Sequence, residues 1–295
     1  MPAHPAALLS PGFIEQLERL SLIARRPVRG WAAGQRRSRR AGHSVEFCDY
    51  RAYGAGDDLR YVDWNIYART DRLYLKLFVD DEDLCLHLLV DASASMDWGE
   101  PSKLQWAVQV AAALGFVGLT GLERVGLGVL RERVAEGWPP GRGRNRIPAL
   151  LDYLARIEPG GATNLNDSLA RYAMHSAGAG LVVLVSDLLD PSGYEAGIKA
   201  LLERGLEVHV IHVLSPSEMQ PELNGDLRLI DQETGEARSL WVDADTLRRY
   251  RERLHRFLDG VDAFCRTHEI AYHRVLTDVA PEQVVMGPLR GRLLA

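Results

Sequence analysis

The feature that most constrains the fold is a series of short apolar runs separated by stretches with helical patterning. The strand-like runs are residues 84–90, 125–130, 181–186, 206–214 and 270–276. They are almost continuously apolar, which is typical of strands covered on both faces in a parallel sheet. Helical patterns occupy residues 103–119, 146–157, 165–176, 194–204 and 244–268. This alternation predicts an α/β fold of the Rossmann-like kind, with a mostly parallel central sheet and helices on both faces.

Two further segments complete the outline of the chain. Residues 73–79 read as a strand that precedes the first buried run, and residues 227–241 read as a hairpin with its turn at 233–236. We expect residues 1–80 to form an N-terminal extension with short strands. Residues 81–295 are expected to form the α/β domain.

Composition places the chain among ordinary soluble proteins. Hydrophobic residues make up 46% and charged residues 25%. The formal net charge is −5, whereas nucleic-acid-binding proteins usually carry an excess of basic residues. Cys48, Cys85 and Cys265 lie far apart in the sequence, without a metal-binding spacing, which favours a reducing cytoplasm. No signal peptide and no transmembrane segment is expected. The sequence therefore predicts a cytoplasmic protein.

One segment departs from the average composition. No acidic residue lies between Glu18 and Glu46, whereas seven arginines lie between Arg25 and Arg40. The simplest interpretation is a solvated basic loop, and the alternative is a docking surface for an acidic partner. RNA binding is a weaker hypothesis, because the segment lacks the interleaved aromatic side chains of a stacking platform.

The residues that carry chemistry follow the first buried run. Residues 91–95 read Asp-Ala-Ser-Ala-Ser, so Asp91, Ser93 and Ser95 lie at alternate positions on the loop that leaves the carboxyl end of a strand. Ligands bind at that edge of a doubly wound sheet. Carboxylate and hydroxyl oxygens suit Mg²⁺, Mn²⁺ or Ca²⁺ rather than zinc or copper.

Two other loops supply matching side chains. Thr163 lies in the glycine-rich segment 160–165 just before a helix, and Asp187 follows the apolar strand 181–186. Taken alone, Thr163 could be a helix N-cap and Asp187 a turn residue. Because both occur together with the first motif in the right strand context, we expect the three loops to form one site.

This set resembles the metal-ion-dependent adhesion site of von Willebrand factor A domains, where the three loops give Asp-x-Ser-x-Ser, Thr and Asp. The matching residues are Asp91, Ser93, Ser95, Thr163 and Asp187. The resemblance implies a Rossmann-like von Willebrand factor A fold and one bound divalent cation. Mg²⁺ is the expected cation, and Mn²⁺ and Ca²⁺ are the alternatives. It also implies that Ser93, Ser95 and often Thr163 contact the metal directly, while Asp91 and Asp187 act mainly through water.

A second block of motifs precedes the domain. It reads Glu46-Phe47, Arg51-Ala52-Tyr53, Gly56-Asp57-Asp58-Leu59-Arg60 and Asp63-Trp64. The block resembles the bacterial family catalogued as domain of unknown function 58 (DUF58). The resemblance implies a MoxR-type AAA+ ATPase as partner, acting as a chaperone in the maturation of a client protein or complex.

Two functions from different classes fit these residues. The first is a non-catalytic, metal-dependent protein-binding module, in which a cation held by neutral hydroxyls recruits a carboxylate from a partner protein. The alternative is a metal-assisted hydrolase or phosphotransferase that uses Asp91 and Asp187. Ser93 stands where phosphatases of that style need a second acid, and no general base or Walker A loop is evident. We therefore expect a binding module without catalytic residues, and no nucleic-acid partner.

Overall fold

The computed structural model describes residues 8–23, 46–54, 59, 62–79, 84–131, 135–162, 164–176 and 180–295. The chain divides into two compact units, one made of Met1–Pro27 with Leu84–Ala295 and the other of Val28–Asp83. This differs from the predicted division, which placed residues 1–80 together. The reason lies in helix α1 (Pro11–Leu17), which buries Phe13 and Leu17 in the core of the larger unit.

The larger unit is built on a six-stranded sheet in the order β10-β7-β6-β3-β4-β5. All neighbouring strands are parallel except β4 and β5. Counted along the chain, the order is 3-2-1-4-5-6, that of a doubly wound fold. The strands are β3 (Cys85–Asp91), β4 (Arg124–Leu130), β5 (Ala135–Gly141), β6 (Gly180–Ser186), β7 (Glu207–Leu214) and β10 (Ala271–Leu276). The predicted Rossmann-like class with a mostly parallel central sheet is confirmed.

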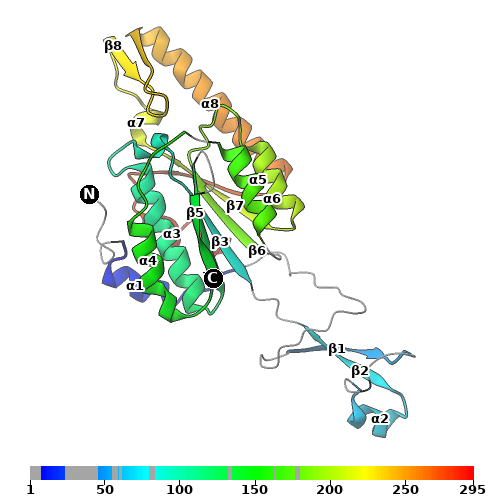
Figure 1. Ribbon diagram of the computed structural model, residues 1–295. Helices are drawn as coiled ribbons and strands as arrows, with labels where there is room; N and C mark the ends of the chain where they lie inside the picture. The colour runs from blue at the N-terminus through cyan, green and yellow to red at the C-terminus, as the bar shows by residue number, and fades with distance from the viewer. Residues whose placement is uncertain are drawn as a thin grey trace. The chain divides into compact units, whose positions relative to one another are not determined.

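Helices cover both faces of this sheet, as Figure 1 shows. On β3, Leu86, Leu88 and Val90 join one core and Leu89 joins the other, as the alternation of side chains along a strand requires. The first core is completed by α1, α3 (Lys103–Thr120), α4 (Ile147–Ala155) and α9 (Pro281–Met286). The second is completed by α5 (Leu165–His175), α6 (Glu195–Glu203) and α8 (Ala244–Thr267).

The longest apolar segment of the sequence forms helix α3. Its interior residues are buried almost all round, so it needs no polar face. Within the described ranges, no helix combines the length and apolar composition needed to cross a bilayer.

The predicted hairpin forms a separate two-stranded sheet. Strands β8 (Gly225–Ile230) and β9 (Ala237–Val242) pair antiparallel, and their connection includes Gly235 with a φ of 72°. A left-handed backbone of this kind favours glycine, which is why the turn falls there. The short helix α7 (Pro216–Met219) precedes the hairpin, and α8 follows it.

The smaller unit contains the predicted short strands. Strands β1 (Glu46–Ala52) and β2 (Tyr74–Val79) pair antiparallel, and helix α2 (Trp64–Thr70) lies between them in the chain. Asp63 of the Asp-Trp motif caps α2 by accepting hydrogen bonds from the backbone of Asn65 and Ile66, while Tyr50 donates to its other oxygen. The basic segment Arg25–Arg40 lies outside the described residues.

Candidate functional site

The site lies where two central strands end side by side. Strands β3 and β6 are parallel neighbours, with Val90 opposite Val185. The residues that follow them, Asp91 and Ser186, therefore leave the same edge of the sheet. The chain turns to opposite sides after these two strands, since β3 continues toward β4 and β6 toward β7. Such a switch point leaves a crevice between the loops, where doubly wound proteins bind ligands.

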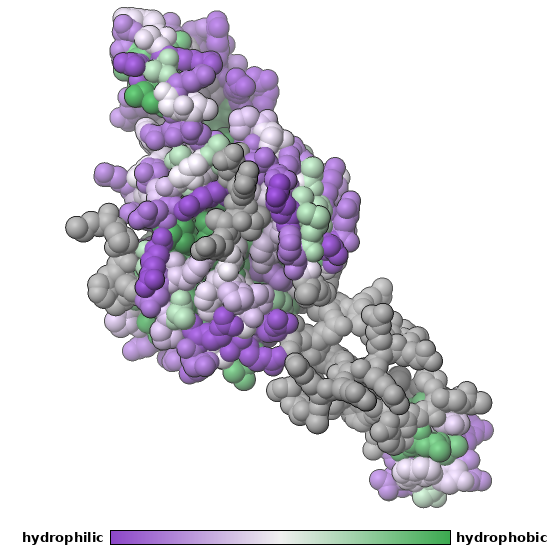
Figure 2. Space-filling model, viewed as in Figure 1, coloured by the Kyte–Doolittle hydropathy of each residue, from purple (hydrophilic) through white to green (hydrophobic). Residues whose placement is uncertain are grey.

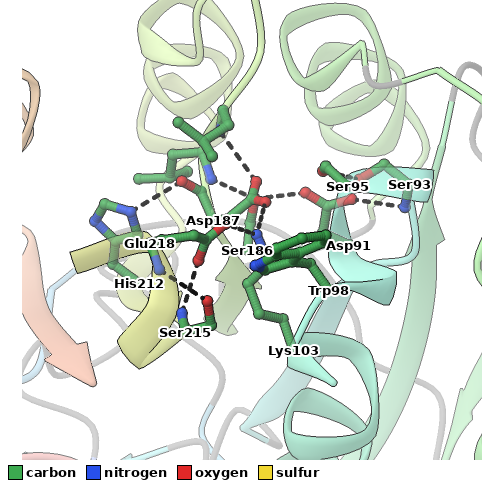
Figure 3. A network of polar contacts seen from close by, with 12 residues as sticks. Asp91, Ser93, Ser95, Trp98, Lys103, Ser186, Asp187, His212, Ser215 and Glu218 are labelled. Atoms are coloured by element: carbon green, nitrogen blue, oxygen red, sulfur yellow. Dashed lines mark hydrogen bonds and ion pairs between the residues drawn. The ribbon is translucent and has the colours of Figure 1, made fainter. Parts of the chain in front are cut away.

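The first loop holds a fully buried carboxylate and two adjacent hydroxyls (Figure 3). One oxygen of Asp91 accepts the Ser93 backbone N–H at 3.0 Å, and the other accepts the Ser186 hydroxyl at 2.5 Å. Ser93 occupies the N-cap position of the 3₁₀ helix η3 (Ala94–Asp97), but its side chain makes no capping bond. Its hydroxyl lies 3.0 Å from that of the half-buried Ser95. The two hydroxyl oxygens of Ser93 and Ser95 thus lie next to each other on the first loop.

The second loop is tied to the first through its backbone. Gly160 donates its N–H to the Ala92 carbonyl at 2.9 Å, and Ala94 donates to the Gly161 carbonyl at 3.1 Å. The predicted ligand Thr163 lies outside the described residues. The N-cap of α5 is Asn164, whose side chain accepts the Asp167 N–H.

The third loop carries the second carboxylate. Asp187 is fully buried, and its Oδ1 accepts the Leu189 N–H at 3.0 Å, so the turn role considered for this residue is real. Leu188 has a φ of 56°, a left-handed conformation that is unusual for leucine. The hydrogen bond from its N–H to the Ser186 hydroxyl at 2.9 Å holds this strained turn in place.

A buried lysine, which the sequence analysis did not single out, completes the arrangement. Lys103 of α3 is 1% exposed, and its ammonium lies 2.7 Å from Asp187 Oδ2 and 2.5 Å from Glu218 Oε1. Glu218 also forms a capping box with Ser215 at the start of α7. The only sequence signal was a lysine at the start of an otherwise apolar helix. Its acidic partners lie 84 and 115 residues away, and no local pattern reveals them.

His212 packs behind the third loop. Its two ring nitrogens lie 2.9 Å from the Asp187 carbonyl and 2.9 Å from the Tyr272 hydroxyl. Burial lowers its pKa to about 4, although the charge and backbone of Asp187 act in the opposite direction. The imidazole is therefore neutral at pH 7, and both of its nitrogens are occupied.

The site carries more negative than positive charge. Burial, and after it the charge of Asp187, raises the pKa of the Asp91 carboxyl to about 6, although hydrogen bonds from Ser186 and Ser93 lower it. Burial disfavours the Lys103 ammonium, but the charges of Asp187 and Glu218 outweigh burial and raise its pKa. The site thus combines three carboxyl groups, those of Asp91, Asp187 and Glu218, with one ammonium.

These observations test whether a divalent cation fits the site. In the described part of the chain, no cluster of three or more His, Cys, Asp or Glu side chains could hold a metal. A cation site here must therefore use the Ser93 and Ser95 hydroxyls together with Asp91 and Asp187. Those groups are hard oxygen donors, the type that Mg²⁺ and Mn²⁺ prefer. The excess negative charge at the site also matches a dication, so the residues fit.

Comparison with known proteins identifies the family. Residues 49–257 match the family described as "Protein of unknown function DUF58". The chain belongs to the DUF58 family. Similar relatives of this DUF58 protein include uncharacterized proteins of Mycobacterium bovis and Mycobacterium tuberculosis. Each is 29% identical over 250 residues, which cover 81% of this chain and 78% of the relative.

Solved structures resemble the DUF58 chain more distantly. The conserved hypothetical protein BatB from Bacteroides thetaiotaomicron gives a TM-score of 0.43 at 16% identity, covering 68% of this chain and 95% of BatB. Manganese-loaded TRAP protein from Plasmodium vivax gives a TM-score of 0.35 at 19% identity, covering 44% of this chain and 57% of that one.

Proposed function

We propose that this DUF58 protein is a non-catalytic, divalent-metal-dependent protein-binding module. The observation that carries the proposal is the convergence of Asp91, Ser93, Ser95 and Asp187 at the switch point, with an excess of negative charge. Mg²⁺ is the proposed cation, with Mn²⁺ or Ca²⁺ as alternatives.

The proposed roles follow from what each side chain already contacts. Asp91 is engaged by Ser93 and Ser186, so it would act on the metal through water and hold the first loop in shape. Ser93 and Ser95 present their hydroxyls together and would contact the metal directly, with Thr163 as the third direct ligand. Asp187 is shared with Lys103 and would also act through water. When bound, the cation supplies an electron-poor centre that attracts a carboxylate of the partner protein.

The surroundings of the two carboxylates support binding over hydrolysis. Asp91 is 0% exposed and both of its oxygens accept hydrogen bonds, so neither is free to attack a substrate. Both ring nitrogens of His212, the histidine beside Asp187, lie at hydrogen-bond distance from other groups, and its pKa is about 4. This histidine is therefore not suited to act as a general base at pH 7.

For the partner, we propose a MoxR-type AAA+ ATPase. The support for this is the family resemblance of the motif block and the family match of residues 49–257. The chain would act as an adaptor or co-chaperone that delivers a client protein or complex to the ATPase. Metal and partner would strengthen each other's binding by the same factor, because coupling between two sites is reciprocal.

The test is a titration of Mn²⁺ and Mg²⁺ into wild type, Asp91→Asn and Asp97→Asn, followed by calorimetry, with and without the ATPase. Asp97 is the matched control, since it lies on the same loop but is exposed. We expect wild type and Asp97→Asn to bind metal, and the ATPase to tighten that binding. Asp91→Asn should lose both effects.

Equal binding of the ATPase in Mg²⁺ and in EDTA would contradict the proposal. Metal-dependent turnover of a generic phosphoester by wild type, lost in Asp91→Asn, would favour the hydrolase instead.

A further inference from the structure

An open apolar groove begins at the candidate metal site. It has a volume of about 480 Å³ and is formed by the first and third loops, α7, the β8–β9 hairpin and the first turns of α8. Exposed apolar side chains gather along it, and contiguous apolar surface of this kind is typical of interaction sites. Figure 2 shows apolar surface among hydrophilic residues at the hairpin end of the larger unit, at the top of the view.

The hairpin turns one of its faces toward this groove. Leu227 pairs with Leu240 and Gly225 with Val242, so these side chains share a face with Leu229. Val242 is 3% exposed at the base, whereas Leu229 and Leu240, farther out, are 43% and 42% exposed. Leu229 and Leu240 are thus uncovered apolar side chains on the outer half of this face, where Arg238 is the cross-strand neighbour of Leu229.

The inner end of the groove borders the candidate metal site. Ser95, Lys103 and Glu218 line both the groove and the site. Two hydrogen bonds fix this end. The Trp98 indole donates to the Ser217 hydroxyl at 3.0 Å, and the Tyr250 hydroxyl donates to the Glu218 carbonyl at 2.8 Å. Trp98 and Tyr250 still leave 47% and 40% of their surface exposed, so a ligand that reaches Ser95 would lie against both rings.

The helix beside the groove is basic in a chain whose net charge is −5. Arg253 lines a smaller apolar hollow that shares Tyr250 and Glu218 with the groove, whereas Arg251 and Arg256 line a separate hollow that shares no residue with the groove. Within the described residues Arg253 forms no ion pair, in contrast to Arg248, which binds Asp245 and Glu252. Asp231 and Glu233 line the hairpin side of the groove, so an acidic residue of an occupant is complemented on the Arg253 side.

We propose that the groove binds an apolar segment of a partner protein that is flanked by acidic residues. One carboxylate of the segment lies at the metal site, its apolar side chains cover Leu229 and Leu240, and a further acidic residue faces Arg253. This rests on the proposed function, and adds to it the part of the partner that determines specificity.

The experiment selects ligands from random peptides displayed on phage, using the full chain in Mg²⁺. We expect wild type to enrich peptides in which an aspartate or glutamate adjoins several apolar residues. The dissociation constant of one selected peptide is then measured by fluorescence polarisation. The proteins compared are wild type, Leu240→Asp, Leu229→Asp and the matched control Ser239→Asp, which adds the same charge to the exposed opposite face of β9.

The groove predicts about tenfold weaker peptide binding for Leu240→Asp and Leu229→Asp, because each change removes an apolar contact and adds a charge facing the acidic ligand. Ser239→Asp should bind like wild type. Circular dichroism checks that each variant is folded, and because both leucines are partly exposed in wild type, their replacement creates no cavity.

Three results would overturn the groove while leaving the metal site intact. They are peptides selected for a carboxylate without any apolar preference, equal binding by Leu240→Asp and wild type, and a wild-type dimer that Leu240→Asp converts to a monomer. Peptide binding that is unchanged in EDTA and after the peptide's aspartate is replaced by asparagine would instead overturn the proposed function. Failure to enrich any peptide would overturn the groove proposal as well.

Discussion

Replacing Lys103 with methionine removes a buried ammonium but keeps a side chain of similar length. In the native protein this ammonium lies 2.7 Å from Asp187 Oδ2 and 2.5 Å from Glu218 Oε1, and the lysine is only 1% exposed. At an effective dielectric constant of about 20, unit charges at 2.7 Å attract each other by about 6 kcal/mol. The cost of taking the ammonium out of water offsets part of this attraction, and the loss leaves Asp187 buried without its cation. We therefore expect Lys103→Met to lower the free energy of unfolding by about 3–5 kcal/mol.

The assay is urea unfolding followed by far-ultraviolet circular dichroism in EDTA. Lys199→Met is the matched control, because Lys199 is exposed on α6, and its effect should stay within about 0.5 kcal/mol. A loss below about 1 kcal/mol for Lys103→Met would refute the reasoning, because it would mean that the pair is screened or that its carboxylates are protonated.

The same variant also reports on the candidate metal site. A cation that binds only the folded protein adds about 2.7 kcal/mol of stability when its concentration is 100 times its dissociation constant. Mg²⁺ should therefore recover more stability in Lys103→Met than in wild type, because the site has lost its own cation. If Mg²⁺ stabilised both proteins equally, Lys103 would have no influence on metal binding.

Three further predictions concern stability. Ser186→Ala removes a hydrogen-bond donor to the Asp91 carboxylate and should lower the free energy of unfolding by about 1–3 kcal/mol at pH 8. The loss should be smaller at pH 5, because a carboxyl group with a pKa of about 6 is mostly protonated there. Urea unfolding at both pH values tests this, and an equal loss at both would contradict it. Burial lowers the pKa of His87 to about 4, so the unfolded chain binds more protons below pH 6.5, and His87 alone should lower the free energy of unfolding by about 3 kcal/mol as the pH drops from 6.5 to 4. Because buried His212 has a similarly lowered pKa, His87→Gln should reduce the fall without abolishing it, and an unchanged slope would exclude a contribution from His87. Leu88→Ala in the core should cost about 2–5 kcal/mol, whereas Leu240→Ala on the hairpin should change the midpoint of thermal unfolding little.

The sequence predicted the central sheet well because its strands are buried on both faces. Continuous apolar runs leave little ambiguity about β3 or β6, and their burial is complete. Strand β5 was not predicted, since it contains Pro139 and Pro140, which oppose strand structure except at an edge. Helix α1 was also missed, because its apolar positions are few and its burial depends on distant parts of the chain.

Half of the candidate site could be predicted from the buried strands of the sequence. Asp91, Ser93, Ser95 and Asp187 each follow a strand, so a parallel topology alone brings them to one edge. The positive charge at that edge was not readable. Lys103 meets Asp187 and Glu218 only after the fold is complete, and a lysine at the start of a helix usually points to solvent.

Two segments of the larger unit that are far apart in the sequence lie side by side. Ser21 and Ala295 exchange backbone hydrogen bonds, and Ile23 donates to the Leu293 carbonyl. On a ribosome, the apolar face of α1 emerges before residues 293–295, which it must await before this part of the fold can close. Closure of this kind has a high contact order, which slows folding and lengthens the time for which apolar surface stays exposed. A growing chain therefore keeps this apolar face exposed until residues 293–295 have been made, and removal of residues 293–295 would leave Ser21 and Ile23 without these backbone partners.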